Sequence, residues 1–142
     1  ATATVLRPSV IYGLTSDNFV TWALSELDAG NELDIVDDQV STPTYAPDLA
    51  DACLEIADRE QTGLYHAAAP ESISRYEFTS TLAEVCGYDP ELISPISTEA
   101  LGQEAPRPAD SSLSSTRLYE ALDYTFTRPR QAFQKLRDDR NN

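Results

Sequence analysis

Short runs of β-branched and aliphatic residues alternate with helical patterns along the chain, and this alternation limits the possible folds more than any other feature. Strands are predicted at residues 2–6, 33–36, 63–67 and 92–97, with Pro95 confining the last to a sheet edge. Helices are predicted at residues 18–29, from Pro47 onward, from Ser74 onward, at 114–122 and at 129–139. Strands that alternate with helices indicate an α/β fold with some parallel pairing, and 142 residues suit a single domain.

The charge balance excludes several classes of partner. The chain has 24 acidic residues against 10 basic ones, which gives a net charge of −14. It would repel phosphate backbones and anionic membrane surfaces, so we expect neither a nucleic-acid partner nor a membrane partner. The acids are scattered, and all the basic residues except Lys135 are arginine. Such a surface is typical of proteins that work in concentrated salt, where self-repulsion is screened, and we hypothesise a halophilic source.

Cysteine use and the apolar runs bear on localisation. Cys53 and Cys86 fall within predicted helices on apolar faces, which favours buried thiols over a disulfide and fits a reducing cytoplasm. No apolar run approaches the roughly 18 residues that span a bilayer. The first residues, ATATVLRPSV, lack the charged start and apolar core of a secretory signal. We therefore expect a cytoplasmic protein.

Ligands of parallel α/β folds bind where strands end and helices begin, and three such junctions here are unusually polar or constrained. They are LRPSVIYG at 6–13, VDDQVSTPTYAPDLA at 36–50 and EAPRPADSSL at 104–113. In the second, Asp37, Asp38 and Gln39 either end the strand through turn hydrogen bonds or contact a ligand. Thr44 follows Pro43 in an extended segment, and either presents its hydroxyl to a ligand or caps the next helix.

Arg107 is an anion-binding candidate in the third junction. Its guanidinium offers a planar fork of donors suited to phosphate or carboxylate, and the flanking Pro106 and Pro108 stiffen the backbone around it. The alternative is a surface arginine paired with Glu104 or Asp110, and the residues alone leave both interpretations open.

No complete catalytic set is apparent in the sequence. His66 is the only histidine and cannot build a metal site alone, so we interpret it as structural and expect no metal. No G-x-G-x-x-G loop follows the first strand, and Tyr12 has Ser16 rather than lysine four residues on. The residues by themselves predict an α/β ligand-binding unit without catalytic residues.

Several motifs occur in an order that resembles one family. LRPSVIYG, NFV, VDDQ, STPTYAPDLA, GLYH, SRYEF, ISPIST and APRPADSSL follow one another as in the C-terminal half of an extended short-chain dehydrogenase/reductase. The chain is most similar to the dTDP-4-dehydrorhamnose reductases, and the similarity runs from Ala1 to about Leu136. One departure is Val10, where those reductases usually have tryptophan.

This resemblance implies the last strands of a Rossmann-type sheet together with a small substrate-binding domain. The glycine-rich loop and the catalytic Tyr-x-x-x-Lys of such proteins lie in an N-terminal dinucleotide-binding half, which we expect to be absent from residues 1–142. The implied parent is an NADPH- or NADH-dependent oxidoreductase that reduces the 4-keto group of a dTDP-linked deoxysugar in dTDP-rhamnose biosynthesis. The fragment alone would be inactive and would bind no cofactor.

The same resemblance implies roles for particular residues. Arg107 and Asn18 would contact the nucleotide sugar, with Arg107 near its diphosphate, while Ser9 would face the cofactor. The other substrate-binding positions that it implies are Val10, Tyr12, Asp38, Gln39, Pro43 and Thr44. Some relatives are non-catalytic regulatory subunits, and such a nucleotide-sugar-binding module is the alternative function. Because the strands would pair in part with an absent sheet, we also expect a homo-oligomer.

Overall fold

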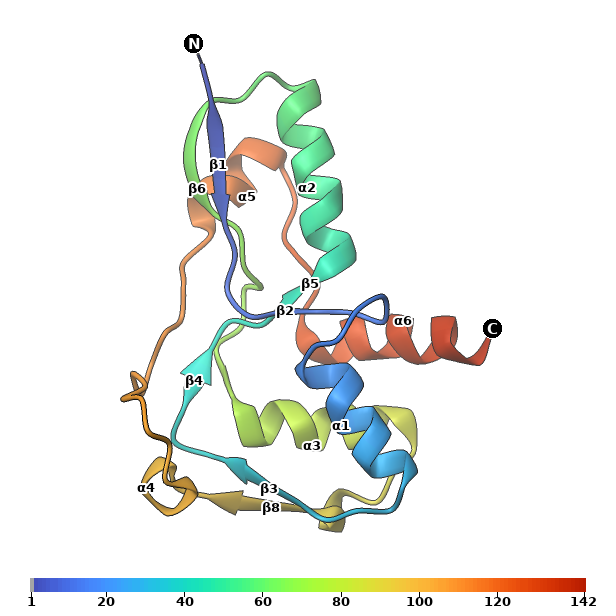
Figure 1. The fold of residues 1–142 in the computed structure, drawn as a ribbon. Helices are drawn as coiled ribbons and strands as arrows, with labels where there is room; N and C mark the ends of the chain where they lie inside the picture. Colours follow the sequence, from blue (N-terminus) through green and yellow to red (C-terminus); the bar gives the residue numbers. More distant parts are fainter. Residues whose placement is uncertain (1) are drawn as a thin grey trace.

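The structure, a computed structural model, describes residues 2–142 and has two lobes (Figure 1). The upper lobe contains β1 (Thr4–Arg7), α2 (Ala46–Asp58), β6 (Gly63–His66) and α5 (Thr116–Leu122). The lower lobe contains α1 (Phe19–Asp28), β3 (Leu33–Val36), α3 (Arg75–Cys86), the 3-10 turn η1 (Pro90–Leu92), β8 (Ile93–Ile96), α4 (Thr98–Leu101) and α6 (Pro129–Asn141). Two-residue strands connect the lobes: β2 (Ile11–Tyr12), β4 (Val40–Ser41), β5 (Thr44–Tyr45) and β7 (Ile73–Ser74). No helix among residues 2–142 has the length and apolar character needed to cross a membrane.

Strand pairing is mostly parallel, as the alternation of strands and helices predicts. β1 pairs with β6, β2 with β5 and β3 with β8, all in parallel, whereas β4 and β7 pair antiparallel. In the β3–β8 pair Ile35 lies opposite Pro95, and β3 is the one strand of the described chain that pairs with β8. The predicted edge position of Pro95 is therefore confirmed.

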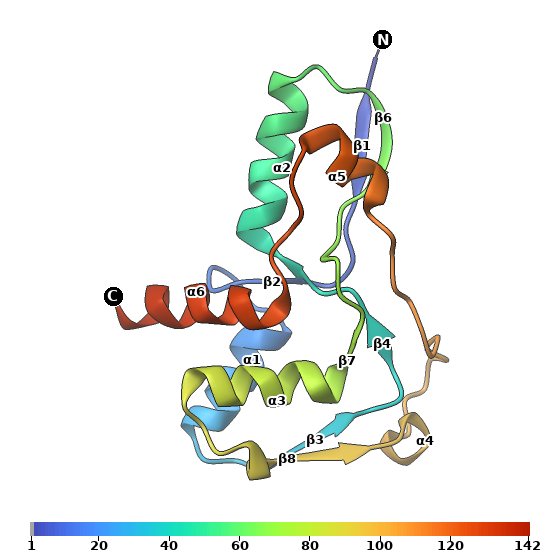
Figure 2. The ribbon, with the colours of Figure 1, turned by 180° about the vertical axis from the view of Figure 1, so that it is seen from behind.

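Each lobe has its own hydrophobic core. The lower core centres on the rings of Tyr12, Phe78 and Phe133, whose centroids lie 4.8 to 5.6 Å apart. The upper core consists of Ala52, Ile56, Tyr65, Ala67, Leu118, Leu122 and Phe126. Asp48, in the first turn of α2, accepts hydrogen bonds from the backbone N–H and the hydroxyl of Thr127, at 2.7 and 3.0 Å. This contact connects α2 to the segment that precedes α6. Helix α6 lies below the lower end of α2 (Figure 1, Figure 2).

Local sequence signals explain where two of the lower-lobe helices begin and end. The side-chain oxygen of Asn18 accepts hydrogen bonds from two backbone N–H groups in the first turn of α1. Ser74 caps α3 by accepting a hydrogen bond from the N–H of Glu77, and Gly87 ends that helix in the left-handed conformation with φ of 82°. Both predicted helices are confirmed.

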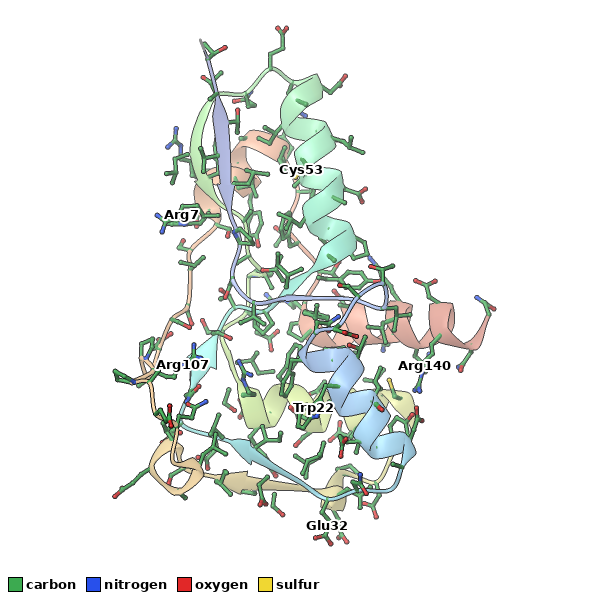
Figure 3. All side chains as sticks on the ribbon, in the orientation of Figure 1. Arg7, Trp22, Glu32, Cys53, Arg107 and Arg140 are labelled. Atoms are coloured by element: carbon green, nitrogen blue, oxygen red, sulfur yellow. The ribbon has the colours of Figure 1, made fainter. Side chains whose placement is uncertain are left out.

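The prediction that both cysteines are buried is wrong for Cys53. Its side chain is exposed on α2, whose buried face instead contains Ala52 and Ile56 (Figure 3). Neighbouring residues of an α-helix differ in direction by about 100°, so an error of one position turns a core side chain into a surface one. Cys86 is half-buried beside the lower core, and both thiols are free.

Candidate functional site

A cavity of about 430 Å³ lies in the lower lobe, between α1, β3, β4, the start of α3 and the loop at residues 102–115. It adjoins the carboxyl end of β3, the position at which ligands of parallel sheets usually bind. Its lining consists of Val10, Phe19, Trp22, Asp34, Ile35, Val36, Gln39, Val40, Ser41, Arg75, Leu101, Gln103, Arg107, Pro108 and Ser111. Three of the predicted site residues, Val10, Gln39 and Arg107, are therefore brought together here.

Arg107 reaches the cavity because its loop pairs with β4 (Figure 3). The backbone N–H of Val40 donates to the carbonyl of Ala109 at 2.8 Å, and the N–H of Ser111 donates to the carbonyl of Val40 at 2.9 Å. These two bonds hold the loop against the strand immediately after Arg107. The guanidinium forms no ion pair with either acid of its loop, nor with any other acid among residues 2–142. The alternative of a paired surface arginine is therefore not the arrangement found.

Asp38 and Gln39 anchor the beginning of the same loop. Asp38 accepts hydrogen bonds from the backbone N–H of Thr98 at 2.9 Å and from its hydroxyl at 2.6 Å, where α4 begins. These bonds hold the pKa of the Asp38 carboxyl below its ordinary value. The Gln39 amide donates to the hydroxyl of Thr98 and to the side-chain oxygen of Gln103, both at 2.9 Å. Asp38 thus holds the start of α4, which is distant in the sequence, and does not make the predicted turn hydrogen bonds within residues 2–142, whereas Gln39 also lines the cavity.

Arg75, to which the sequence patterns assign no ligand role, shares the cavity with Arg107. It is the first residue of α3, and its backbone N–H donates to the carbonyl of Gln39 at 3.1 Å. Its guanidinium lies over the ring of Phe19, 4.7 Å from the ring centroid. Burial lowers the pKa of Arg75, and the positive charge of Arg107 lowers it further. Two cations therefore line one cavity, and of these Arg75 is half-buried whereas Arg107 is exposed.

An apolar wall on α1 completes the cavity. Trp22 lies on α1 (Figure 3). The ring centroids of Phe19 and Trp22 lie 5.5 Å apart, and Trp22 is 45% exposed. Val10 adds a partly exposed aliphatic side chain beside them. Guanidinium donors, an amide, hydroxyls and an aromatic wall together can bind an anion that also carries a ring.

Two of the predicted ligand-binding residues lie in the protein interior. Tyr12 is 1% exposed and packs in the aromatic cluster of the lower core, and Thr44 is fully buried. Burial raises the pKa of the Tyr12 hydroxyl, which has no hydrogen-bond partner within the described chain. Thr44 does not cap α2, because no side chain caps that helix. Both residues pack the interior here, and a ligand contact for either stays a prediction.

The other predicted contacts lie at the margin of the cavity or outside it. Asn18 donates from its amide to the carbonyls of Gly13 and Ser16 while its oxygen caps α1, so its side chain is fully engaged. Pro43 is buried beside a small void next to Val10. Ser9 is half-buried in the bend between β1 and β2. Their ligand and cofactor roles stay predictions.

Cavity residues that the sequence analysis missed lie on strands, in the loop and on helices, and Arg75 and Trp22 on helices are the most informative of them. Arg75 lies within the Ser-x-x-Glu spacing of Ser74 and Glu77, and helix capping accounts for that motif without giving the arginine a role. Trp22 follows Phe19 by three residues, a spacing typical of a packed helix face. One sequence signal could have found this wall of the cavity. The chain's only tryptophan, Trp22, lies three residues after Phe19 on the predicted helix that follows the LRPSVIYG junction.

Parallel strand pairs with a polar cavity at a strand's carboxyl end are features of the extended short-chain dehydrogenase/reductase fold. Residues 1–141 match the RmlD substrate binding domain, and the chain belongs to that family. It is 40% identical over 116 residues to the dTDP-4-dehydrorhamnose reductase of Mycobacterium tuberculosis (strain CDC 1551 / Oshkosh), covering 80% of this chain and 38% of that protein. It is 35% identical over 136 residues to the spore coat polysaccharide biosynthesis protein SpsK of Bacillus subtilis (strain 168). That match covers 96% of this chain and 46% of SpsK. The chain thus spans less than half the length of these relatives.

A solved structure confirms the fold class. The crystal structure of dTDP-4-dehydrorhamnose reductase from Bacillus anthracis str. Ames, in complex with NADP, matches this chain with a TM-score of 0.87 at 24% identity. The match covers 96% of this chain and 48% of the other. The family and fold class predicted from the motif order are therefore confirmed.

Proposed function

We propose that this chain is the substrate-binding half of an NADPH- or NADH-dependent sugar-nucleotide reductase of the dTDP-4-dehydrorhamnose reductase type. Family membership and the names of two relatives support a role with sugar nucleotides or polysaccharide precursors. The substrate is a dTDP-linked 4-keto deoxysugar, and the reaction of the parent protein is reduction of that keto group. The match to less than half of each relative supports the assignment as a half.

One observation carries this proposal. In a chain of net charge −14, the cavity contains Arg107 without an acidic partner among residues 2–142. An acidic protein that leaves a guanidinium unneutralised in a cavity offers it to an external anion. The diphosphate of a sugar nucleotide is such an anion, while Gln39 and Ser111 suit ligand hydroxyls and Trp22 suits a ring.

The residues of this chain do not fit a dinucleotide. Its 142 residues contain no G-x-G-x-x-G loop and no Tyr-x-x-x-Lys pair. The nicotinamide would supply the hydride when bound, and the B. anthracis relative that contains NADP is about twice as long as the matched region. We therefore place the cofactor and the proton-donating tyrosine in another part of the parent protein, and expect residues 1–142 alone to be inactive.

A non-catalytic nucleotide-sugar-binding or regulatory module is the second candidate, because the chain itself lacks the catalytic pair. The two candidates share the cavity and differ in the rest of the parent protein. An intact Tyr-x-x-x-Lys in sequence adjoining residue 1 supports the enzyme, whereas a substituted pair supports the module.

Calorimetric titration of dTDP and of NADPH into the protein at molar salt tests the proposal. We expect dTDP to bind, NADPH not to bind, and Arg107→Ala to abolish the dTDP signal. Arg117→Ala is the matched control, because Arg117 lies in the upper lobe and donates to the carbonyl of Leu64 instead of lining the cavity. Failure of dTDP to bind the folded protein would contradict the proposal, and so would binding of NADPH alone.

We also propose a cytoplasmic homo-oligomer without nucleic-acid or membrane partners. Val5 and Leu64 are register partners in the β1–β6 pair, and both are exposed. An apolar strip on a two-stranded pair favours association, because it removes these side chains from water. Light scattering at molar salt should give a mass above 15.6 kDa, and a clean monomer mass would contradict this part of the proposal.

A further inference from the structure

Two arginines of this acidic chain line the same cavity, and neither has an acidic partner in the described chain. Five arginines form ion pairs with acids: Arg59, Arg128, Arg130, Arg137 and Arg140. The guanidiniums of Arg7, Arg75 and Arg107 form neither an ion pair nor a hydrogen bond within residues 2–142, and Arg7 lies outside the cavity. Arg75 and Arg107 both line it. Two guanidiniums without acidic partners in one cavity, in a sequence with 24 acids, point to a ligand that supplies the negative charge.

Phe19 holds Arg75 in position without using its hydrogen-bonding capacity. The guanidinium stacks 4.7 Å from the centroid of the Phe19 ring, which leaves the N–H groups at its edge free to donate. Phe19 in turn packs against Trp22, at 5.5 Å, and against the buried Phe78, at 6.3 Å between centroids. A preorganised guanidinium loses little conformational entropy when an anion binds.

The two guanidiniums approach the cavity from different parts of the chain. Arg75 begins α3, and Arg107 lies in the loop that β4 holds in place. Their mutual repulsion is offset when a ligand brings more than one negative charge between them. Asp34 also lines the cavity, without an ion pair to either arginine, and its exposed carboxylate suits a ligand hydroxyl.

We propose that Arg75 and Arg107 form a two-arginine clamp that selects nucleoside diphosphates over nucleoside monophosphates, with Phe19 as the positioning residue for Arg75. This inference rests on the proposed function and deepens it. It names Arg75 as the second phosphate-binding residue and the second phosphoryl group as the part of the substrate that Arg75 recognises. Each guanidinium binds one phosphoryl group, so a monophosphate engages one arginine and leaves the other without a partner.

The single tryptophan provides the measurement. Trp22 lines the cavity beside Phe19, so its fluorescence reports binding of dTDP, dTMP and inorganic pyrophosphate without a label. We expect the wild type to bind dTDP about tenfold or more tightly than dTMP, since the diphosphate gains a second charge-assisted contact. Arg75→Gln should weaken dTDP binding about tenfold and dTMP binding much less, so that the preference for dTDP is largely lost.

Two further variants separate a clamp from a structural effect. Arg117→Gln removes a guanidinium that lies over Tyr65 at the same 4.7 Å but outside the cavity, and it should leave both affinities unchanged. Phe19→Leu keeps an apolar side chain while releasing Arg75, and it should lower the ratio of dTDP to dTMP affinity. A purely structural role for Phe19 would weaken both ligands equally and leave that ratio unchanged.

The possible outcomes distinguish the clamp from the function on which it rests. If the wild type binds dTDP and Arg75→Gln behaves like Arg117→Gln, the clamp is overturned while the proposed function stands. If the folded wild type binds neither dTDP nor pyrophosphate, the proposed function fails, and the clamp fails with it. Loss of the diphosphate preference in Arg75→Gln, with an unfolding midpoint like that of the wild type, supports the clamp.

Discussion

The two lobes differ in how completely each buries its apolar residues. In the described chain the lower core has sixteen buried residues and the upper core has seven. The upper lobe leaves Leu54, Val5 and Leu64 exposed, at 72%, 50% and 44%. The lower lobe leaves Trp22 and Leu101 exposed, at 45% and 43%. Since apolar burial is the main driving force of folding, the lower lobe has the larger share of the stability.

The same division separates the candidate cavity from the upper lobe. The cavity is lined by α1, β3, β4, α3 and the loop at 102–115, and no residue of β1, β6, α2 or α5 contributes to it. A ligand wall needs side chains that are fixed in position, and the better packed lobe supplies them. The comparison therefore predicts that binding depends on the lower core and tolerates damage to the upper one.

The largest expected effect is in the lower core. Phe133 is fully buried between the rings of Tyr12 and Phe78, at centroid distances of 5.6 and 4.8 Å. Phe133→Ala should lower the free energy of unfolding by about 3–5 kcal/mol, because it removes an aromatic ring and leaves a cavity. Urea denaturation at constant salt measures this change. Phe133→Leu, which keeps most of the apolar volume, should cost about 1 kcal/mol. A cost below about 1 kcal/mol for the alanine variant would show that this cluster does not dominate the lower lobe.

A substitution in the upper core should cost less stability than one in the lower core, and it should leave ligand affinity unchanged. Leu118 is fully buried on α5, and Leu118→Ala should cost about 2–4 kcal/mol in local stability. Hydrogen exchange should quicken in α2 and β6 while the amides of α3 keep their protection, and dTDP affinity should be unchanged. Leu54→Ala, at an exposed position of the same lobe, should change stability by less than about 0.5 kcal/mol. Equal acceleration of exchange in α3 would mean that the lobes unfold as one unit.

The sequence allowed prediction of the longer elements in both lobes, because each has a local signal. β3 was predicted over residues 33–36 and found there, since LDIV is a compact apolar run. Ser74 and Gly87 mark the ends of α3 through capping and left-handed backbone geometry. By contrast, β2, β4, β5 and β7 have two residues each, which is too short for any periodicity to appear.

The candidate site was predictable only in part, because it is assembled by tertiary contacts. The rigid, anion-binding character of Arg107 could be inferred from its flanking prolines and the scarcity of bases. The proximity of Arg107 to Arg75 could not be inferred from the sequence, because the hydrogen bonds between Val40 and the loop bring the two arginines together. The interior position of Tyr12 likewise depends on α3 and α6, which supply Phe78 and Phe133.

Salt should stabilise the upper lobe more than the lower one. Helix α2 has four acids and no base within Ala46–Asp58, whereas α6 has four bases and two acids. Raising salt from about 0.1 M to about 1 M shortens the screening length from roughly 10 to 3 Å, which weakens repulsion along α2. Hydrogen exchange should therefore slow more in α2 than in α6 over this range. The double variant Asp51→Asn, Asp58→Asn should reduce the difference. Equal slowing in both helices, or no gain in stability with salt, would contradict both the comparison and the halophilic hypothesis.

The smallest expected effect concerns an ion-pair network that fastens α6 to the lower lobe. Asp28 accepts hydrogen bonds from the hydroxyl of Tyr88 and from Arg140, and Arg140 also donates to that hydroxyl at 2.6 Å. The bond from Tyr88 first, and then the charge and bond of Arg140, hold the pKa of Asp28 below its ordinary value. A lowered pKa in the folded state means that this stabilisation is present above the unfolded pKa, near 3.9, and is lost as pH falls through the folded value.

Asp28→Asn tests that network through its pH dependence. Because the carboxylate is half exposed, the variant should be less stable than the wild type by only about 0.5 kcal/mol near neutral pH. The difference should shrink as the pH is lowered below about 4, because the wild-type carboxyl then becomes protonated as well. Asp17→Asn is the control, since Asp17 makes no side-chain hydrogen bond or ion pair within the described chain. Urea denaturation of the three proteins across this pH range measures the effect. A difference that stays constant with pH would mean that Asp28 contributes by shape and hydrogen bonding, and that its charge does not fasten α6.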